Sequence, residues 1–329
     1  MRNLSMSDHR NLVSDRSPFL SFVLILITVF IGFVVVGPLL GFAVGSQIYD
    51  GNLLNDLQTG SDNPGFFLAG MVVQGIAAFV GLVVFPVMHI RFLEHKSLSP
   101  FFPDQPKLGQ ILLAVVFLGV AFLVAISPIS EWNSVMHFPE SMKAFETWAR
   151  EKEDMAAKIT ESLTHFSSLS DVMLALLVIA VLPGVGEELV FRGMIQRELW
   201  RSSQNIHLAI WTSAFIFSAI HIQFFGFFPR LLLGALFGYV YYWSDNLWVP
   251  IFAHFVNNAM GVVGIYMSQQ KLTELNMEDN TAAPWPLVLV GVVATAGLSY
   301  FIWNHYRQNP PNVKDFSGSS VLPHQDPLV

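Results

Sequence analysis

The sequence predicts an all-α fold, a polytopic membrane helix bundle with about eight transmembrane helices. Of its 329 residues, 53% are hydrophobic and 12% are charged, whereas soluble domains carry about 25% charged residues. The mean hydropathy is +0.51, and several uncharged runs reach the roughly 20 residues that a helix needs to cross the core of a bilayer. These observations exclude a disordered chain and argue against a soluble enzyme.

The chain contains no cysteine, which excludes disulfides, thiol nucleophiles, iron–sulfur clusters and zinc held by thiolates. Its formal net charge is −7, and its 17 Lys and Arg residues are scattered along the chain. This charge pattern argues against nucleic acid as a partner. The expected surroundings are therefore a lipid bilayer.

The first half of the chain predicts three spans, at about 19–44, 66–88 and 111–129. The first run is far longer than the roughly 7–15 apolar residues of a signal peptide, so we interpret it as a retained span. The second half predicts five more, one from about 173 through Glu187-Glu188 and then 208–221, 231–243, 250–267 and 286–303. The fifth and sixth are short, and the turn between them is tolerated near the membrane only where protein covers it.

The distribution of Lys and Arg favours an orientation with both termini cytoplasmic, in the plasma membrane if the protein is bacterial. Both tails, the loop after the second span and the end of the fourth span carry these residues, whereas the first external loop has Asp and neither of them. The predicted organisation is a cytoplasmic tail (1–16), three N-terminal spans (17–132), an amphipathic external loop (133–170), a catalytic core (171–267), a last span (286–304) and a disordered C-terminal tail (305–329).

Within the 133–170 loop, apolar residues recur at near-helical spacing, which predicts an amphipathic helix on the membrane surface. These residues are Met142, Phe145, Trp148, Met155, Ile159 and Leu163. A role in gating the access of a substrate is the alternative interpretation.

Polar residues inside apolar spans are the places to seek function, because a charge at the bilayer centre costs from about 2.5 to over 10 kcal/mol. The first cluster is Gly186-Glu187-Glu188-Leu189-Val190-Phe191-Arg192. Glu188 and Arg192 are one helical turn apart and can form an ion pair. Glu187 is turned away by about 100° and is left free for proton exchange. The alternative is that both glutamates mark the cytoplasmic end of the helix, with Arg192 as its anchor.

Two further clusters lie in later spans. Phe217-Ser218-Ala219-Ile220-His221 ends the fifth span, and a single membrane histidine is more often a packing residue than a catalyst. His254-Phe255-Val256-Asn257-Asn258 puts His254 and Asn258 on one face of the seventh span, where an imidazole and an amide also serve as contacts between helices. Taken singly, neither cluster decides between structure and catalysis.

In this order, the motifs EExxxR, FxxxH and HxxxN on three membrane helices resemble the CPBP family. This family comprises the CAAX proteases and bacteriocin-processing enzymes, also called Abi proteins, and its members are type II CAAX prenyl endopeptidase-like membrane proteins. The resemblance covers about 173–266. It implies that Glu187 activates a water molecule as general base and that Glu188 is held by Arg192. It also implies that His221 helps to bind or polarise the water.

For the remaining motif, the resemblance implies that His254 and Asn258 form an oxyanion hole. The chemistry agrees, because hydrolysis of a peptide bond needs a base for water and donors for the developing oxyanion. An amide and a neutral imidazole supply such donors without burying a further charge.

A zinc site is the minority alternative. Two His and one Glu are a legitimate set of zinc ligands, but the sequence lacks HExxH, and His221 and His254 lie on different predicted helices. The resemblance requires no metal, so no cofactor is firmly implied.

The function that we expect is that of an intramembrane endopeptidase acting on a peptide or membrane-protein substrate. Its cavity lies among spans four to seven and is expected to open at the cytoplasmic end, where the glutamates are placed. The sequence leaves open whether the substrates are prenylated C-termini, leader peptides, bacteriocins or other membrane proteins. The alternative is a non-enzymatic immunity or scaffold protein that binds a peptide or partner in the same cavity. A transporter is disfavoured, because transporters usually show repeated halves.

Overall fold

The computed structural model describes residues 16–63, 65–105, 107–273 and 280–309, and these contain helices and no strand. Seven of their helical segments are long and apolar enough to cross a membrane, and α11 (Ile206–Ala219) is a shorter apolar helix. The prediction of an all-α bundle with about eight spans is therefore confirmed. The predicted N-terminal tail up to residue 15, and the predicted C-terminal tail from residue 310, lie outside the described residues.

The first half of the chain forms three crossings. The first two contain wider π-helical stretches within a continuous helix; the label η marks these stretches and also the short 3-10 turns. The first crossing joins α1 (Pro18–Phe30), η2 (Ile31–Val36) and α2 (Gly37–Gly45), and the short α3 (Leu53–Thr59) follows. The second joins α4 (Phe66–Ala78), η3 (Phe79–Val84), α5 (Phe85–Met88) and η4 (His89–Leu93). After the 3-10 turn η5 (Ser99–Phe101), the third crossing is α6 (Leu108–Ser134).

The second half begins with the 3-10 turn η6 (Glu140–Met142) and α7 (Lys143–Leu163), the helix expected in the 133–170 loop. One continuous helix, Leu169–Ser203, then joins α8 (Leu169–Ala175), η7 (Leu176–Val181), α9 (Leu182–Glu188), η8 (Leu189–Ile195) and α10 (Gln196–Ser203). After α11 come the turn η9 (Phe224–Gly226), α12 (Phe227–Ser244), α13 (Trp248–Gln269) and α14 (Trp285–Gln308).

Side-chain caps explain where two of these helices begin. Ser168 accepts a hydrogen bond from the backbone of Asp171, whose carboxylate accepts from the backbone of Ser168 in return. This capping box starts the helix several residues before the apolar run. Asn205 likewise accepts from the backbone of Leu208 at 3.1 Å and starts α11. Hydropathy alone misses both starts, because capping residues are polar.

The end of α14 also differs from expectation. The tail was expected to begin at residue 305, but the helix continues to Gln308. Tyr306 is buried, and its hydroxyl donates to Oε1 of Gln105 at 2.9 Å. A hydrogen-bonded aromatic residue that packs on the bundle stabilises the last turn.

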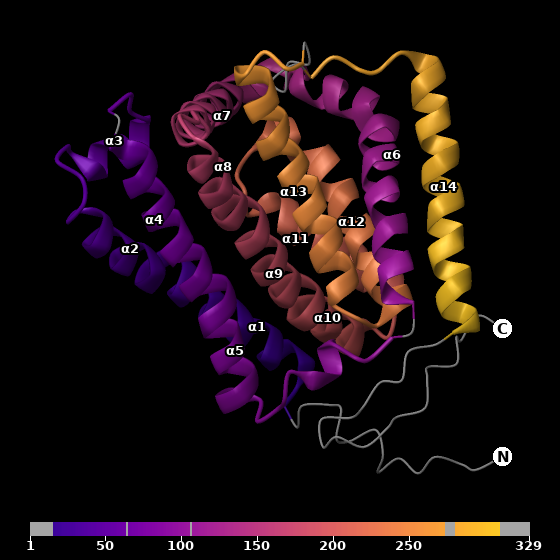
Figure 1. The fold of residues 1–329 in the computed structure, drawn as a ribbon. Helices are drawn as coiled ribbons and strands as arrows, with labels where there is room; N and C mark the ends of the chain where they lie inside the picture. The colour runs from indigo at the N-terminus through magenta and orange to yellow at the C-terminus, as the bar shows by residue number, and fades with distance from the viewer. Residues whose placement is uncertain (1–15, 64, 106, 274–279, 310–329) are drawn as a thin grey trace, which may run out of the picture.

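The helices stand side by side, with the start of α1 and the end of α14 at the same end of the bundle (Figure 1). This agrees with an even number of crossings. Helix α7 lies across the opposite end (Figure 1). Helix α13 packs on α9, α6 and α12, whereas α11 packs on α12, α10 and η8.

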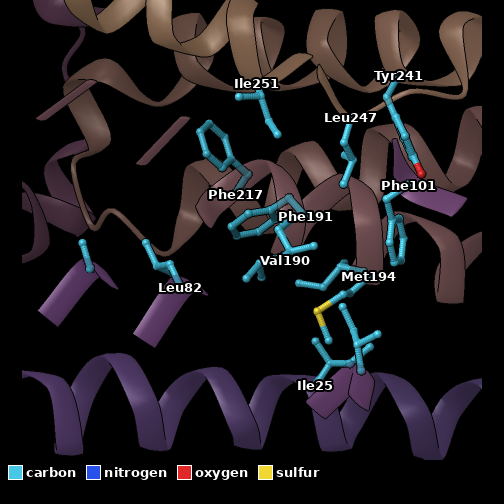
Figure 2. Close-up of a cluster of buried hydrophobic side chains, with 14 residues drawn as sticks. Ile25, Leu82, Phe101, Val190, Phe191, Met194, Phe217, Tyr241, Leu247 and Ile251 are labelled. Carbon is cyan, nitrogen blue, oxygen red and sulfur yellow. The ribbon is translucent and has the colours of Figure 1, made fainter. Parts of the chain in front are cut away.

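A buried apolar cluster fixes the centre of the long helix. Figure 2 shows Val190 and Met194 of η8 between Ile25 of α1 and Ile251 of α13. Within a bilayer such side chains stabilise the contact between helices by close van der Waals packing. This packing holds η8, and with it Arg192, against its neighbours.

Candidate active site

The two adjacent glutamates lie at the end of α9, close to the middle of the continuous helix Leu169–Ser203. The sequence analysis placed them at the end of the fourth span, whereas the helix continues beyond them to Ser203. The residues that follow, 189–203, mix apolar and charged side chains. Hydropathy reads such a mixture as the end of a span, although it contains no proline and the helix continues through it.

Glu188 forms a buried ion pair with Arg192, as the spacing predicted. Arg192 Nη1 donates to Glu188 Oε1 at 2.9 Å, and both side chains are at most 1% exposed. A second guanidinium nitrogen donates to the carbonyl of Gly234 at 2.8 Å. The guanidinium also faces the rings of Phe217 and Phe237, at 5.0 and 5.6 Å from their centroids. These contacts enclose the charge of Arg192 completely.

His254 joins this pair from another helix. Its Nδ1 lies 2.8 Å from Glu188 Oε1, the oxygen that accepts from Arg192. Its Nε2 lies 3.8 Å from Glu187 Oε2. His254 is thus flanked by both glutamates, one on each ring nitrogen.

Glu187 and Glu188 have different surroundings, although they are neighbours in sequence. The side chain of Glu188 is fully buried, whereas that of Glu187 is 18% exposed. Within the described residues, no hydrogen bond holds the Glu187 carboxylate. Glu187 is therefore the carboxylate that remains available to a bound molecule.

The aromatic residue of the second motif lies between the two histidines. The Phe217 ring lies 5.1 Å from the His221 ring and 6.1 Å from the His254 ring, edge to face in both cases. The carbonyl of Phe217 accepts a hydrogen bond of 2.7 Å from His221 Nδ1. His221 follows the last turn of α11 and is held in place by this bond.

Asn258 lies one turn beyond His254 on α13. Its side-chain amide donates to the carbonyl of Ile179 at 2.9 Å, and its oxygen accepts from Asn257 at 3.1 Å. The structure thus brings Glu187, Glu188 and His254 into contact, whereas Asn258 contacts η7 and His221 bonds to its own helix. Among the described residues, no hydrogen bond joins His221 or Asn258 to a glutamate.

Two glycines of the first motif allow close helix contacts that the sequence analysis did not assign. A Cβ atom at Gly184 would come within 3.2 Å of the backbone of Ile251 and Phe255 on α13. One at Gly186 would come within 2.5 Å of Leu82 Cβ. The run Pro183-Gly184-Val185-Gly186 is the signal for this approach, because only small residues let helices pack so closely.

Two cavities border the segment that links His221 to α12. One, of about 430 Å³, is mainly apolar and includes Ser218, Ile222 and Gln223 in its lining. The other, of about 220 Å³, is lined by Phe225, Arg150 and Glu153 among others. Both lie at the α7 end of the bundle, and neither has Glu187, His221 or His254 in its lining. The opening of the site's cavity at the opposite, α10, end therefore stays a prediction.

Arg230 is a residue near the site that sequence reasoning missed. It lies in the first turn of α12, and its positive charge acts on Glu187 and His221. The sequence analysis began the predicted span at residue 231, just after Arg230, whereas the apolar helical segment of the structure, Phe224–Ser244, contains it. As to metals, the described residues contain no group of three or more His, Asp or Glu side chains placed to hold an ion.

Residues 169–260 match the family model described as "Type II CAAX prenyl endopeptidase Rce1-like". "Uncharacterized protein YpbD" of Bacillus subtilis (strain 168) is 30% identical over 89 residues, which are 26% of this chain and 42% of that protein. "Putative membrane peptidase YdiL" of the same organism is 29% identical over 188 residues, or 57% of this chain and 69% of that protein.

No solved structure gives a significant match to the chain. The match to YpbD spans less than half of that relative. The matched family segment contains every candidate site residue, from Glu187 to Asn258. The resemblance read from the three motifs is thus confirmed, and residues 169–260 of this membrane protein match the Rce1-like type II CAAX prenyl endopeptidases.

Proposed function

We propose that the chain is an intramembrane endopeptidase in which Glu187 activates the water that hydrolyses a peptide bond. The observation that carries this proposal is the contrast between the two adjacent glutamates. Glu188 is enclosed and bonded to Arg192 and His254, whereas the partly exposed carboxylate of Glu187 has no hydrogen bond among the described residues. The family match and the name of YdiL support a peptidase.

The reaction begins when Glu187 takes a proton from water as general base. The oxygen of that water forms a bond with the carbonyl carbon, and the carbonyl oxygen gains the negative charge of a tetrahedral intermediate. As the intermediate collapses, the C–N bond breaks and Glu187 returns the proton to the leaving amine. His221 assists by binding the water, because its Nδ1 hydrogen is used on the Phe217 carbonyl and the Nε2 of a neutral ring accepts.

His254 and Asn258 are proposed to stabilise the oxyanion. Their contacts with other residues determine which of their hydrogens can be donated to it. Glu188 is paired with Arg192, and an ionised carboxylate only accepts hydrogen bonds, so Nδ1 of His254 carries the hydrogen between them. Nε2 then donates only when the ring is doubly protonated. Asn258 has one amide hydrogen left after its bond to Ile179.

The proposed substrate is a peptide or a membrane protein that reaches the site within the lipid bilayer. CAAX-like specificity is part of the proposal and follows only from the family match. Both termini are proposed to be cytoplasmic, because Lys and Arg gather in the tails and near α10. In a bacterial cell the membrane is the plasma membrane.

The test is comparative proteomics of membrane fractions from cells with the wild-type protein, with Glu187→Gln, and without the protein. We expect new protein termini that appear only with the wild type, because the amide that replaces the carboxylate takes up no proton. Glu161→Gln, a change at an exposed glutamate of α7, is the matched control and should yield the wild-type termini. If cells with Glu187→Gln show the same protein termini as the wild type, and cells without the protein lack them, the carboxylate is not catalytic. A binding or scaffold function then replaces the enzyme.

A further inference from the structure

Arg230 is a half-buried cation that the proposed mechanism does not yet use. It lies in the first turn of α12, and its guanidinium folds back over the turn that follows His221. Nη2 donates to the side-chain oxygen of Gln223 at 2.7 Å, and Nη1 lies 3.5 Å from the Gln223 carbonyl. Gly226 leaves room for it, since a Cβ there would lie 3.2 Å from Nη2. The turn therefore holds the guanidinium in a defined position.

In the part of the chain that the structure describes, the charge of Arg230 has no close anionic partner. Among the described residues, no carboxylate oxygen lies within 4.0 Å of its guanidinium. Its interactions with Glu153 and Glu187 act over a longer distance. Arg192, by contrast, is bonded to Glu188 and to the Gly234 carbonyl and is covered by two aromatic rings. Since a charge that is partly removed from water is costly unless it is paired, this arrangement indicates a functional role.

The position of Arg230 relates it to the candidate site. Gln223, which accepts its 2.7 Å hydrogen bond, is two residues beyond His221, so the guanidinium is held at the turn that follows this candidate site residue. Its charge also acts on Glu187 over a longer distance. Gln223, which holds it, lines the 430 Å³ cavity, and Phe225 of the same turn lines the 220 Å³ cavity. The guanidinium is therefore fixed at the turn that connects His221 to α12, and residues of this turn border both cavities.

The proposed reaction needs a hydrogen-bond donor for the oxyanion whose availability does not depend on pH. His254 donates from Nε2 only as the imidazolium, and Asn258 has already committed one amide hydrogen to Ile179. A guanidinium carries five N–H donors and stays charged at every physiological pH. Two bonds to Gln223 leave donors of Arg230 unused.

We propose that Arg230 is a further catalytic residue, whose guanidinium donates to the carbonyl oxygen of the scissile peptide bond and stabilises the oxyanion. This inference rests on the proposed function. When the water activated by Glu187 adds to the carbonyl carbon, the carbonyl π electrons move to the oxygen, beside the guanidinium. When they return, the C–N bond breaks and the proton on Glu187 goes to the amine. Arg230 itself gains and loses no proton.

The test uses the full chain in detergent micelles with a mixture of internally quenched fluorescent peptides as probe. In Arg230→Gln we expect kcat to fall about 10²–10³-fold, the loss typical of one oxyanion donor, with KM little changed. Arg230→Lys keeps the positive charge but loses the planar guanidinium with its several N–H donors. The kcat of this variant should therefore lie between that of the wild type and that of Arg230→Gln. Arg91→Gln, at an exposed arginine of η4, is the matched control and should behave as wild type.

The outcomes separate this inference from the proposed function. Wild-type kcat in Arg230→Gln, or a raised KM with unchanged kcat, overturns the role of Arg230, because the latter pattern marks binding of the ground state alone. If Glu187→Gln is inactive in the same assay, the endopeptidase proposal stands regardless. If Arg230→Gln fails to fold, Gln223→Ala replaces it. That variant frees the guanidinium from its holder and should lower kcat by less, whereas an unchanged kcat again overturns the inference.

Discussion

The Nδ1 atom of His254 lies 2.8 Å from Glu188 Oε1, across the contact between α13 and α9. The same oxygen accepts the 2.9 Å bond from Arg192. Glu188 is therefore committed to holding two cationic or hydrogen-donating side chains of different segments. Its neighbour Glu187 has no hydrogen bond among the described residues. The proposed chemistry needs this difference, because one carboxylate holds the site together and the other must be available as the general base.

Removing the arginine should destabilise the fold strongly. Arg192→Met leaves the carboxylate of Glu188 buried without its ion-pair partner, a change that costs about 3–5 kcal/mol when one half of a buried pair is removed. The free energy of unfolding in mixed micelles measures this loss. The double variant Glu188→Gln/Arg192→Met should be more stable than Arg192→Met alone, because it removes the uncompensated charge. Equal stability of the single and double variants would contradict this account of the pair.

Replacing either candidate histidine should abolish activity while the protein still inserts into the membrane. We expect His221→Ala and His254→Ala each to lower kcat by about 10²–10⁴-fold, the usual contribution of a positioned acid–base group. His207→Ala is the control, since His207 is exposed on α11 and bonds to the hydroxyl of Tyr239. Cleavage of the quenched peptides measures kcat, and wild-type activity in either variant would remove that histidine from the mechanism.

The elements that the sequence predicted are those that depend on local pattern. The apolar runs predicted the spans, and the four-residue spacing predicted the pair of Glu188 and Arg192, because both follow from the period of one helix. The contact of His254 with Glu188 joins residues 66 positions apart. No spacing within either helix predicts that contact. The ordered motifs, through the family resemblance, put both residues in one site but did not predict that they touch.

The position of the site in the bundle was not predictable from hydropathy. The helix continues from the glutamates to Ser203 through residues such as Gln196, Arg197 and Glu198, which a window average counts as loop. The glutamates were therefore assigned to the end of a span, and Arg230 was left outside the predicted span 231–243. Both differences have one cause, namely that polar residues covered by protein look the same in a sequence as polar residues in water.

Close packing of the first two crossings should be sensitive to a single added methyl group. A Cβ atom at Gly81 of η3 would lie 2.3 Å from the Cα of Phe33 in η2. Gly81→Ala should therefore cost about 1–3 kcal/mol or more through overpacking, measured as the free energy of unfolding in micelles. Gly119→Ala on α6 is the matched control, because nothing lies within 4 Å of its Cβ. That variant should be stabilised by roughly 0.5–1 kcal/mol, and equal effects of the two changes would refute the packing argument.

The start of α7 should lose a stabilising contact in acid. The backbone N–H of Phe138, together with His137 and Arg150, lowers the pKa of Glu146 from 4.5 to about 2. A folded-state pKa below the unfolded value contributes stability that is fully present above the unfolded pKa and is lost as pH falls through the folded one. The difference in unfolding free energy between wild type and Glu146→Gln should thus be constant above pH 4.5 and shrink from there to about pH 2. Denaturant titrations across that range measure it. A difference that stays constant down to pH 2 would mean that the ionised carboxylate does not hold Phe138 and Arg150 in place.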